Sequence, residues 1–328
     1  MTTQQNIDTE LTRMLGIQYP IIMAPMFLVS NEDMIIAAYK AGITGCIPAL
    51  NYRDDESFRK ALDRIVQAGT LVYGINLIAN KSNIRLDEQL KTCIEYKVPF
   101  IITSLGSPEK IIQSCKPLGI RVFCDVVDDV YAAKVESLGA DAVIAVNSGA
   151  GGHAGPMPAE QLIPLLKNKC KIPVISAGGI GNGIHLHQIL SWGACGASVG
   201  SMFIASNEAP VSNDYKQAIV NYGAKDIVLT TRLSGTPCTI INTPYVQQTG
   251  TQQSRFERFL NKNKRLKKWA KMLTFYKGMK MLEKSAFGAS YKTMWCAGPS
   301  IEYVKNIRPV ADIVSTIIDE YHAASAKH

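Results

Sequence analysis

Eight short runs of mostly apolar, β-branched residues recur over the first 200 positions of the chain, about 20–30 residues apart. Most lack alternating polar residues, as is expected of parallel strands that are covered on both faces. The sequence therefore predicts a parallel sheet with a helix after each strand. The expected strands cover residues 20–24, 43–48, 71–77, 99–103, 121–127, 141–146, 173–177 and 196–200.

Amphipathic segments lie between these runs, and several begin or end at residues typical of helix ends. Eight strands in regular alternation with helices favour a closed (β/α)8 barrel, the TIM barrel, over about residues 15–225, in a domain that we place at residues 1–225. An open doubly wound sheet is the alternative. The expected helices cover residues 30–42, 54–68, 128–138, 183–192 and 209–222, and two more begin near 107 and 157.

After Gly223 this alternation stops. Residues 226–243 look extended and residues 253–287 helical, which predicts a mainly helical subdomain over residues 226–294. Residues 295–328 are expected to pack back on the barrel through a helix at 310–321.

The net charge of the chain is +8, and much of the excess lies within residues 255–284. Apolar side chains recur there at helical spacing, so we interpret the stretch as an amphipathic insert with a solvated basic face. Binding to a polyanion or an acidic membrane surface is the alternative, although no nucleic-acid-binding motif accompanies it. These apolar residues are Leu266, Trp269, Leu273 and Tyr276.

Several classes of protein are disfavoured by composition. The longest nearly unbroken apolar run, residues 20–29, is much shorter than the ~18–20 residues that a membrane helix needs. The polar N-terminus does not resemble a secretory signal, so a cytoplasmic protein is expected. The eight cysteines form no Cys-x-x-Cys pair, which predicts free thiols, no zinc site and no disulfide framework.

Glycine-rich turns follow the seventh and eighth predicted strands. Ala177-Gly178-Gly179 follows the first of these, and Gly200-Ser201 follows the second. Backbone N–H groups at two such neighbouring turns can bind one phosphate, because side chains larger than hydrogen would block a close approach. The sequence predicts a phosphate-bearing ligand, either flavin mononucleotide (FMN) or a sugar phosphate.

Two further strand ends carry candidate ligand-binding groups. The first predicted strand ends in Ala24-Pro25-Met26, an apolar turn, and the third ends in Asn76. A carboxamide can both donate and accept hydrogen bonds, which suits the edge of a flavin ring. The sixth strand leads into a glycine-rich loop that contains His153, whose imidazole can hold a proton or bind an anion.

The segments PIIMAPM (20–26), GIN (74–76), GAGGHAG (149–155), ISAGGI (175–180) and VGSMF (199–203) together resemble the nitronate monooxygenase, or 2-nitropropane dioxygenase-like, family. That resemblance implies an FMN-dependent TIM barrel, a flavoprotein oxidoreductase. Its substrates would be a small anionic alkyl nitronate and O2, and its products a carbonyl compound and nitrite. The sequence does not decide between a monomer and a homodimer.

The resemblance also assigns site residues. His153 matches the catalytic histidine, Asn76 would lie at the edge of the flavin ring, and Val126 would pass the ring at the end of the fifth strand. The residues that would line the ring are Ala24, Pro25 and Met26, and those that would approach the cofactor are Gly151 and Gly152. Its phosphate would be held by Ala177, Gly178, Gly179, Gly200 and Ser201.

The chain departs from the family pattern at four positions, and the mildest departure is Ser201 in place of a usual threonine. Ala154 stands where many members have arginine, and Gly298-Pro299 stands where relatives carry Gly-Gln. Gly149 replaces a glutamate that is usual in flavin-dependent enoyl-ACP reductases. An NAD(P)H-dependent flavin reductase of enoyl thioesters or quinones is the alternative function, and the absence of this glutamate disfavours the enoyl-ACP reductase form of it without excluding it.

Overall fold

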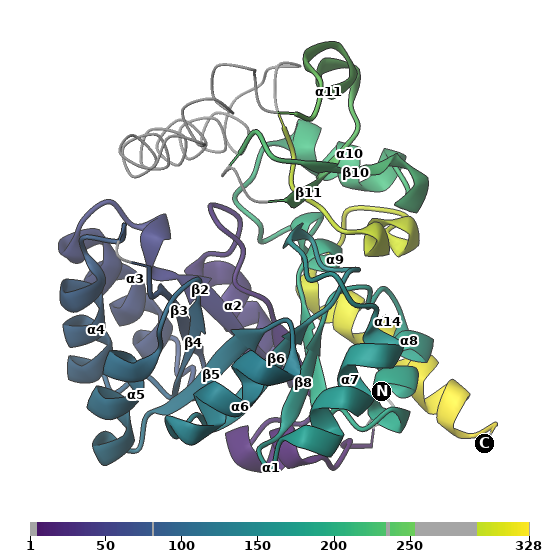
Figure 1. Cartoon of the computed structure of the whole chain (residues 1–328). Helices are drawn as coiled ribbons and strands as arrows, with labels where there is room; N and C mark the ends of the chain where they lie inside the picture. The colour runs from purple at the N-terminus through teal and green to yellow at the C-terminus, as the bar shows by residue number, and fades with distance from the viewer. Residues whose placement is uncertain (1–4, 81, 234–236, 253–293, 328) are drawn as a thin grey trace.

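The computed structural model describes residues 5–80, 82–233, 237–252 and 294–327. Its main body is a closed parallel barrel with the strand order β1-β2-β3-β4-β5-β6-β8-β9 (Figure 1). Pairing of β9 with β1 closes the ring and excludes the open sheet. The predicted TIM barrel is therefore confirmed. Its strands are β1 (Ile21–Met23), β2 (Thr44–Pro48), β3 (Gly74–Ile78), β4 (Phe100–Ser104), β5 (Arg121–Val126), β6 (Ala142–Val146), β8 (Val174–Ala177) and β9 (Gly196–Val199).

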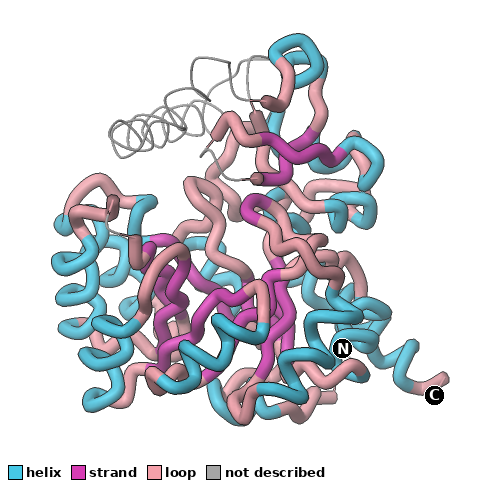
Figure 2. The backbone as a smooth tube through the Cα atoms, in the orientation of Figure 1, coloured by secondary structure: helices cyan, strands magenta, loops and turns pink. Residues whose placement is uncertain are grey.

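Helices surround this ring of strands (Figure 2). Each of the seven expected helices has a counterpart. Helix α4 lies between β3 and β4, where no helix bounds were predicted. The helices are α1 (Glu10–Leu15), α2 (Glu32–Lys40), α3 (Asp55–Gln67), α4 (Leu86–Glu95), α5 (Glu109–Cys115), α6 (Asp129–Ser137), α7 (Ala159–Lys169), α8 (Gly183–Ser191), α9 (Ser201–Ile204) and α10 (Asn213–Asn221). Short 3-10 turns η1 (Ala49–Asn51), η2 (Lys116–Leu118) and η3 (Ala224–Asp226) complete the connections.

Apolar side chains fill the interior of the barrel. The rings of Phe100 and Phe123 stack with their centroids 5.2 Å apart. A Cβ atom at Gly74 would lie only 2.2 Å from the Phe100 ring, so this glycine makes room for the aromatic pair. Leu11 of α1 belongs to the same buried cluster as the two rings. The interior is therefore packed, and chemistry is left to the carboxyl ends of the strands.

A second, three-stranded antiparallel sheet lies above the carboxyl ends of the barrel strands (Figure 1). It has the order β10 (Ile227–Thr230), β11 (Cys238–Ile241) and β7 (Gly152–His153), and α11 (Pro244–Thr249) follows it. The extended character expected of residues 226–243 is thus seen in β10 and β11. The predicted helical stretch 253–287, with its basic part 255–284, lies outside the described residues.

The C-terminal segment packs back on the barrel. Cys296 forms a β-bridge with Ile240, η4 (Pro299–Tyr303) follows, and α14 (Val310–Ser325) lies along α8. The carboxylate of Glu320 accepts a hydrogen bond from the Gly183 N–H of α8 at 2.9 Å. A Cβ atom at Gly183 would lie 2.2 Å from a backbone atom of α14, so the two helices are in close contact. The expected closing helix at 310–321 is confirmed and ends four residues later.

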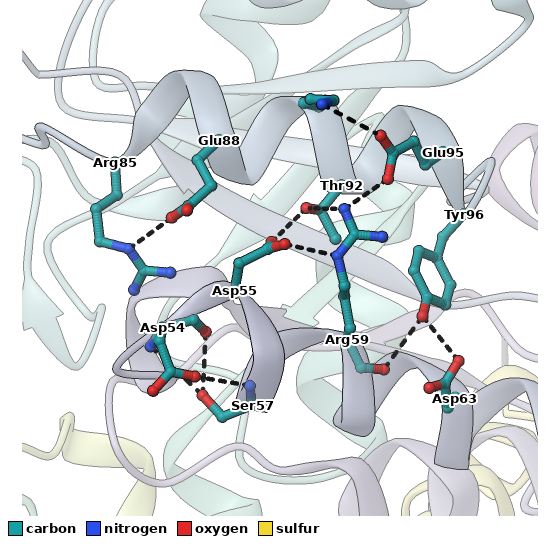
Figure 3. Close-up of polar contacts among 11 residues, drawn as sticks. Asp54, Asp55, Ser57, Arg59, Asp63, Arg85, Glu88, Thr92, Glu95 and Tyr96 are labelled. Atoms are coloured by element: carbon teal, nitrogen blue, oxygen red, sulfur yellow. Dashed lines mark hydrogen bonds and ion pairs between the residues drawn. The ribbon is translucent and has the colours of Figure 1, made fainter.

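Polar contacts join α3 and α4 on the outside of the barrel (Figure 3). Arg59 binds Asp55 at 2.6 Å and Glu95 at 2.5 Å, and Thr92 donates a hydrogen bond to Asp55. Burial would raise the pKa of Asp55, but the hydrogen bonds from Thr92 and Arg59 outweigh it and lower the pKa. Exposed pairs of this kind contribute little individually, so the network orients the two helices more than it stabilises the fold.

None of the helices in the described ranges is long and apolar enough to cross a membrane. All eight cysteines are described, and all are free thiols. Within the same ranges, no group of three or more His, Cys, Asp or Glu side chains is arranged to hold a metal ion.

Candidate active site

A cavity of about 700 Å³ lies at the carboxyl ends of the barrel strands, below the small sheet. Every residue proposed from the sequence as a site residue borders this one cavity, although these residues come from six different strands and the loops that follow them. They are Ala24, Pro25, Met26, Asn76, Val126, Gly151, Gly152, His153, Ala177, Gly178, Gly179, Gly200 and Ser201. Their individual roles stay predictions.

The apolar turn after β1 is held by two side chains behind it. Ser30 Oγ accepts a hydrogen bond from the Met26 N–H at 3.0 Å and donates one to the Ala24 carbonyl at 3.2 Å. Asn51 accepts from the Leu28 N–H and donates to the Ser30 carbonyl, both at 2.8 Å. These contacts hold Leu28 in the left-handed region, with φ 59°. The turn that includes Pro25 therefore has a fixed shape before any ligand binds. The sequence analysis did not single out Asn51.

The two glycines after β8, Gly178 and Gly179, differ in how much space lies where a side chain would project. Gly178 has φ 112°, and a Cβ atom there would lie 2.4 Å from the Ala150 nitrogen. This glycine is therefore needed for contact with the loop after β6, whatever its predicted part in phosphate binding. Gly179 has φ 78°, and a Cβ atom there would come no closer than 4.0 Å to other residues. Gly179 thus leaves space on that side, while its N–H donates to the Gly149 carbonyl at 2.9 Å.

Loops from three parts of the chain meet beside this corner. Asn147 donates to the Gly178 carbonyl at 3.1 Å and accepts from the Gly149 N–H at 2.8 Å. Ser201 Oγ accepts from the Gly298 N–H at 2.9 Å. Because that bond uses only an acceptor position, the Ser201 hydroxyl can still donate its proton. A Cβ atom at Gly151 would lie 2.8 Å from both partners of this bond, so Gly151 is also required for packing.

His153 is positioned by strand pairing and not by a free loop. Its Cα atom is paired with that of Cys238 across β7 and β11, and Gly152 is paired with Thr239. Thr239 Oγ1 also donates to the Ala150 carbonyl at 3.0 Å. The imidazole is partly exposed, but surrounding protein atoms desolvate it and lower its pKa below the usual value. His153 is therefore mainly neutral at pH 7.

An acidic group that the sequence analysis missed also borders the cavity. Asp125 accepts a hydrogen bond from Ser104 at 2.5 Å, and Ser104 accepts one from Asn76 Nδ2 at 2.9 Å. Burial raises the pKa of Asp125 to about 6, although the Ser104 hydrogen bond acts in the opposite direction. A carboxylate inside an otherwise apolar predicted strand was the signal that could have identified it.

Two thiols contribute to the cavity wall beside His153. The sulfur atoms of Cys238 and Cys296 are 3.8 Å apart, and the Tyr215 hydroxyl donates to the Cys296 carbonyl at 2.5 Å. The contact with Cys238 and burial raise the pKa of Cys296 well above the usual value, so this thiol stays protonated.

No lysine or arginine is found among the described residues that border the cavity. Apart from Asp125 and His153, the titratable groups at its wall are the thiols Cys238 and Cys296 and the phenols Tyr131 and Tyr215. The wall thus presents backbone groups, apolar side chains and two groups that can exchange protons near neutral pH. That combination suits a flat, largely apolar cofactor ring with a polar edge.

Comparisons with known proteins identify the family of this chain. The nitronate monooxygenase family profile matches residues 54–320. A nitronate monooxygenase of Paraburkholderia phytofirmans is 28% identical over 71% of this chain and 76% of that protein. A "(3aS,4S,5R,7aS)-5-hydroxy-7a-methyl-1-oxo-octahydro-1H-indene-4-carboxyl-CoA dehydrogenase" of Rhodococcus jostii is also 28% identical, over 73% of this chain and 67% of that protein.

Solved structures show the same fold over nearly the whole chain. FabK from Thermotoga maritima has a TM-score of 0.84 and 28% identity, and the match covers 98% of both chains. A nitroalkane oxidase from Streptomyces ansochromogenes has a TM-score of 0.78 and 20% identity, covering 97% of this chain and 99% of that one. The family match extends over well more than half of the sequence. The chain therefore belongs to the nitronate monooxygenase family, and it is an FMN-dependent oxidoreductase.

Proposed function

We propose that this protein oxidises small alkyl nitronates with dioxygen, giving a carbonyl compound and nitrite, in the cavity above the barrel. The observation that carries the proposal is the position of His153. Strand pairing with β11 holds it at the wall of the same cavity that receives the glycine turns after β8 and β9. When bound, FMN would accept electrons from the substrate and pass them to dioxygen.

The residues at the cavity fit such a cofactor. The turns at 177–179 and 200–201 would hold its phosphate through backbone N–H groups and the Ser201 hydroxyl. Asn76 would meet the polar edge of the ring, and the fixed turn 24–26 would lie along its face. Gly179 supports this assignment only by leaving space, because an added Cβ would come no closer than 4.0 Å to other residues, whereas its own N–H already donates to the Gly149 carbonyl at 2.9 Å.

His153 would act on the substrate and not on the phosphate. A neutral imidazole has one N–H donor and one acceptor nitrogen, so it can hold a nitronate oxygen or accept a proton. The lowered pKa argues against a permanently cationic partner for the anion. We therefore assign His153 to hydrogen bonding and proton transfer.

The test begins with the purified protein, which should contain about one FMN per chain. The enzyme is then mixed anaerobically with a small alkyl nitronate, and reduction of the flavin is followed by its absorbance. Readmission of oxygen should restore the oxidised spectrum and release nitrite. Flavin-replete enzyme that shows neither change would reject the proposed substrate.

A second candidate is a flavin-dependent oxidoreductase of acyl thioesters or related carbonyl compounds that uses NAD(P)H or a similar hydride donor. One observation favours it: the cavity of about 700 Å³ is lined mainly by apolar side chains and backbone, which suits a substrate that is larger and less polar at its reacting end than a small nitronate. The similarity to FabK and to the CoA-ester dehydrogenase points the same way. Anaerobic reduction of the flavin by NADH, NADPH or an acyl-CoA, with no reduction by nitronates, would support this second function.

A further inference from the structure

We propose that Asp125 carries an exchangeable proton on the cavity side of its carboxyl group and donates it in a hydrogen bond to the flavin ring. Binding of FMN would then be accompanied by uptake of one proton at this residue. Ser104 and Asn76 would be positioning residues that decide which carboxyl oxygen carries the proton. The inference rests on the FMN site proposed above and is independent of the substrate.

The direction of every hydrogen bond in this group is determined by the atoms present. Asn76 Nδ2 lies 3.1 Å from the Ile102 carbonyl, which can only accept, and 2.9 Å from Ser104 Oγ. Both amide protons of Asn76 are therefore used, and the Ser104 oxygen acts as an acceptor. The hydroxyl proton of Ser104 must then point to Asp125 Oδ2, at 2.5 Å.

One carboxyl oxygen of Asp125, Oδ1, is available to carry a proton without loss of the hydrogen bond from Ser104. Protonation on Oδ1, which has no hydrogen-bond partner among the described residues, keeps the hydrogen bond from Ser104 to Oδ2, whereas protonation on Oδ2 would reverse that bond and take the Ser104 hydroxyl proton away from it. Asp125 borders the cavity, and so does Asn76, whose carbonyl oxygen can only accept. Side by side, the two side chains present one acceptor and one potential donor to a ligand.

The neighbours of Asp125 keep its charge uncompensated. The nearby titratable groups are Cys46 on β2, Cys124 on β5 itself and Tyr131 on α6, and each has a raised pKa, so all three are uncharged at neutral pH. Tyr131 donates its own proton to the Gly106 carbonyl. On the β6 side, Asp125 is paired with Ile144, which is apolar. Among the residues that the structure describes, no cation therefore stabilises the ionised form, in agreement with a pKa of about 6.

A flavin ring has alternating donors and acceptors along its polar edge. Asn76 can accept from the ring N–H, whereas only the protonated form of Asp125 can donate to a neighbouring ring carbonyl or nitrogen. Covering the cavity with the ring also removes water from Asp125, which further favours the neutral acid. FMN should consequently bind more tightly as the pH falls through the pKa of Asp125.

The experiment measures the dissociation constant of FMN for the full-length apoprotein between pH 5.5 and 8, by quenching of flavin fluorescence. Wild type is compared with Asp125→Asn, whose neutral amide can accept from Ser104 and donate into the cavity. The phosphate of FMN ionises in the same pH range. The ratio of wild-type to variant dissociation constants at each pH therefore removes its contribution and that of His153.

We expect this ratio to be lowest near pH 5.5 and to increase about tenfold by pH 7.5. Ser104→Ala removes a hydrogen bond that favours the carboxylate, so the rise should move to higher pH. Asp87→Asn is the charge-matched control: its exposed carboxylate pairs with Lys110 on the outer surface, and its profile should match wild type. If Asp125→Asn does not fold, the number of protons taken up when FMN binds is measured by calorimetry in buffers of different ionisation enthalpy. Wild type and Ser104→Ala are compared in this way, and uptake by Ser104→Ala should persist to higher pH.

A ratio that stays constant across the pH range would overturn the inference, as would binding without proton uptake. A ratio that falls with rising pH would also overturn it, because the carboxylate would then be the binding form. Wild-type protein that binds no FMN at any pH would instead reject the proposed cofactor site itself.

Discussion

His153 in β7 lies directly opposite Cys238 in β11. The contact between these strands includes a hydrogen bond from Thr239 to the Ala150 carbonyl, a separation of 89 residues along the chain. The candidate catalytic group thus depends on a distant segment for its position. Side chains alternate between the faces of a strand, so this pairing also decides which way the imidazole points.

His153→Asn should leave FMN binding and the fold intact but lower nitronate turnover by ~10²–10⁴-fold if the imidazole transfers a proton. Burial lowers the pKa of His153, so its neutral form persists at lower pH than that of an ordinary histidine. The base-dependent rise of the wild-type rate should therefore occur below about pH 6.5. Steady-state rates of wild type and variant at several pH values test this. Near-normal turnover by the flavin-replete variant would remove His153 from the mechanism.

Thr239→Val should reduce turnover without removing FMN. The variant loses the hydrogen bonds to the Ala150 and Gly152 carbonyls at 3.0 and 3.3 Å, which hold β7 against β11. A loss of about 0.5–1.5 kcal/mol in stability is expected for bonds of this kind. Thr230→Val provides a matched control, because its hydroxyl binds the Thr251 carbonyl in the same sheet, away from β7. Equal activity losses in both variants would argue against a specific role of Thr239.

Gly178→Val should abolish FMN binding while the barrel remains folded. The added Cβ would lie 2.4 Å from the Ala150 nitrogen, so the loop after β6 must move. Gly119→Ala is a useful control, since Gly119 also has a positive φ, 71°, but no atom lies within 4 Å of the added Cβ. Flavin content and circular dichroism distinguish the outcomes. A Gly178→Val protein with full flavin content would show that this loop contact is dispensable for the site.

Phe123→Ala should destabilise the protein by about 3–5 kcal/mol, because it removes a fully buried ring and leaves a cavity in the barrel interior. Its stacked partner, Phe100, would lose contacts as well. Urea unfolding followed by circular dichroism measures the change. A loss below 1 kcal/mol would mean that the interior repacks around the missing ring.

The raised pKa of Asp125 also predicts a pH-dependent stability of the apoprotein. The folded-state pKa, about 6, exceeds the ordinary value of 3.8, so the favourable contribution is complete below pH 4 and is lost as the pH rises through 6. Asp125→Asn should therefore stabilise the apoprotein at pH 7, by roughly 1–3 kcal/mol, and have less effect at pH 4. Thermal unfolding at both pH values measures the difference. If the variant changed the melting temperature equally at pH 4 and pH 7, the change would come from packing and not from ionisation of Asp125.

The barrel was predictable because its signals are local. Each of the eight apolar runs overlaps one observed strand, and every boundary differs by three residues or fewer. Leu71 belonged to a predicted strand but is 73% exposed, and β3 begins only at Gly74. Helix α4 received no predicted bounds, since it begins after Arg85 with no side-chain cap to mark its start.

Residues of the cavity wall could be expected from the sequence where a strand leads into a glycine turn, as at Gly178 and Gly200, or carries a polar side chain, as at Asn76. The two-residue strand β7 could not be expected, because its formation depends on β11 and not on local sequence. Asp125 was missed since periodicity treats it as one residue of an apolar strand. The proximity of Cys238 and Cys296 likewise arises only when distant segments pack together.

The pairing of β7 with β11 has a consequence for how this chain can change. Successive residues of a strand face opposite sides, so inserting or deleting one residue between Asn147 and His153 would shift the register and turn the imidazole away from the cavity. Asn147 fixes the start of this segment through its hydrogen bonds to Gly178 and Gly149. An added or missing residue therefore cannot be accommodated by a shift of the backbone at Asn147. The length of this loop is thus constrained as strictly as the glycine at position 151 within it.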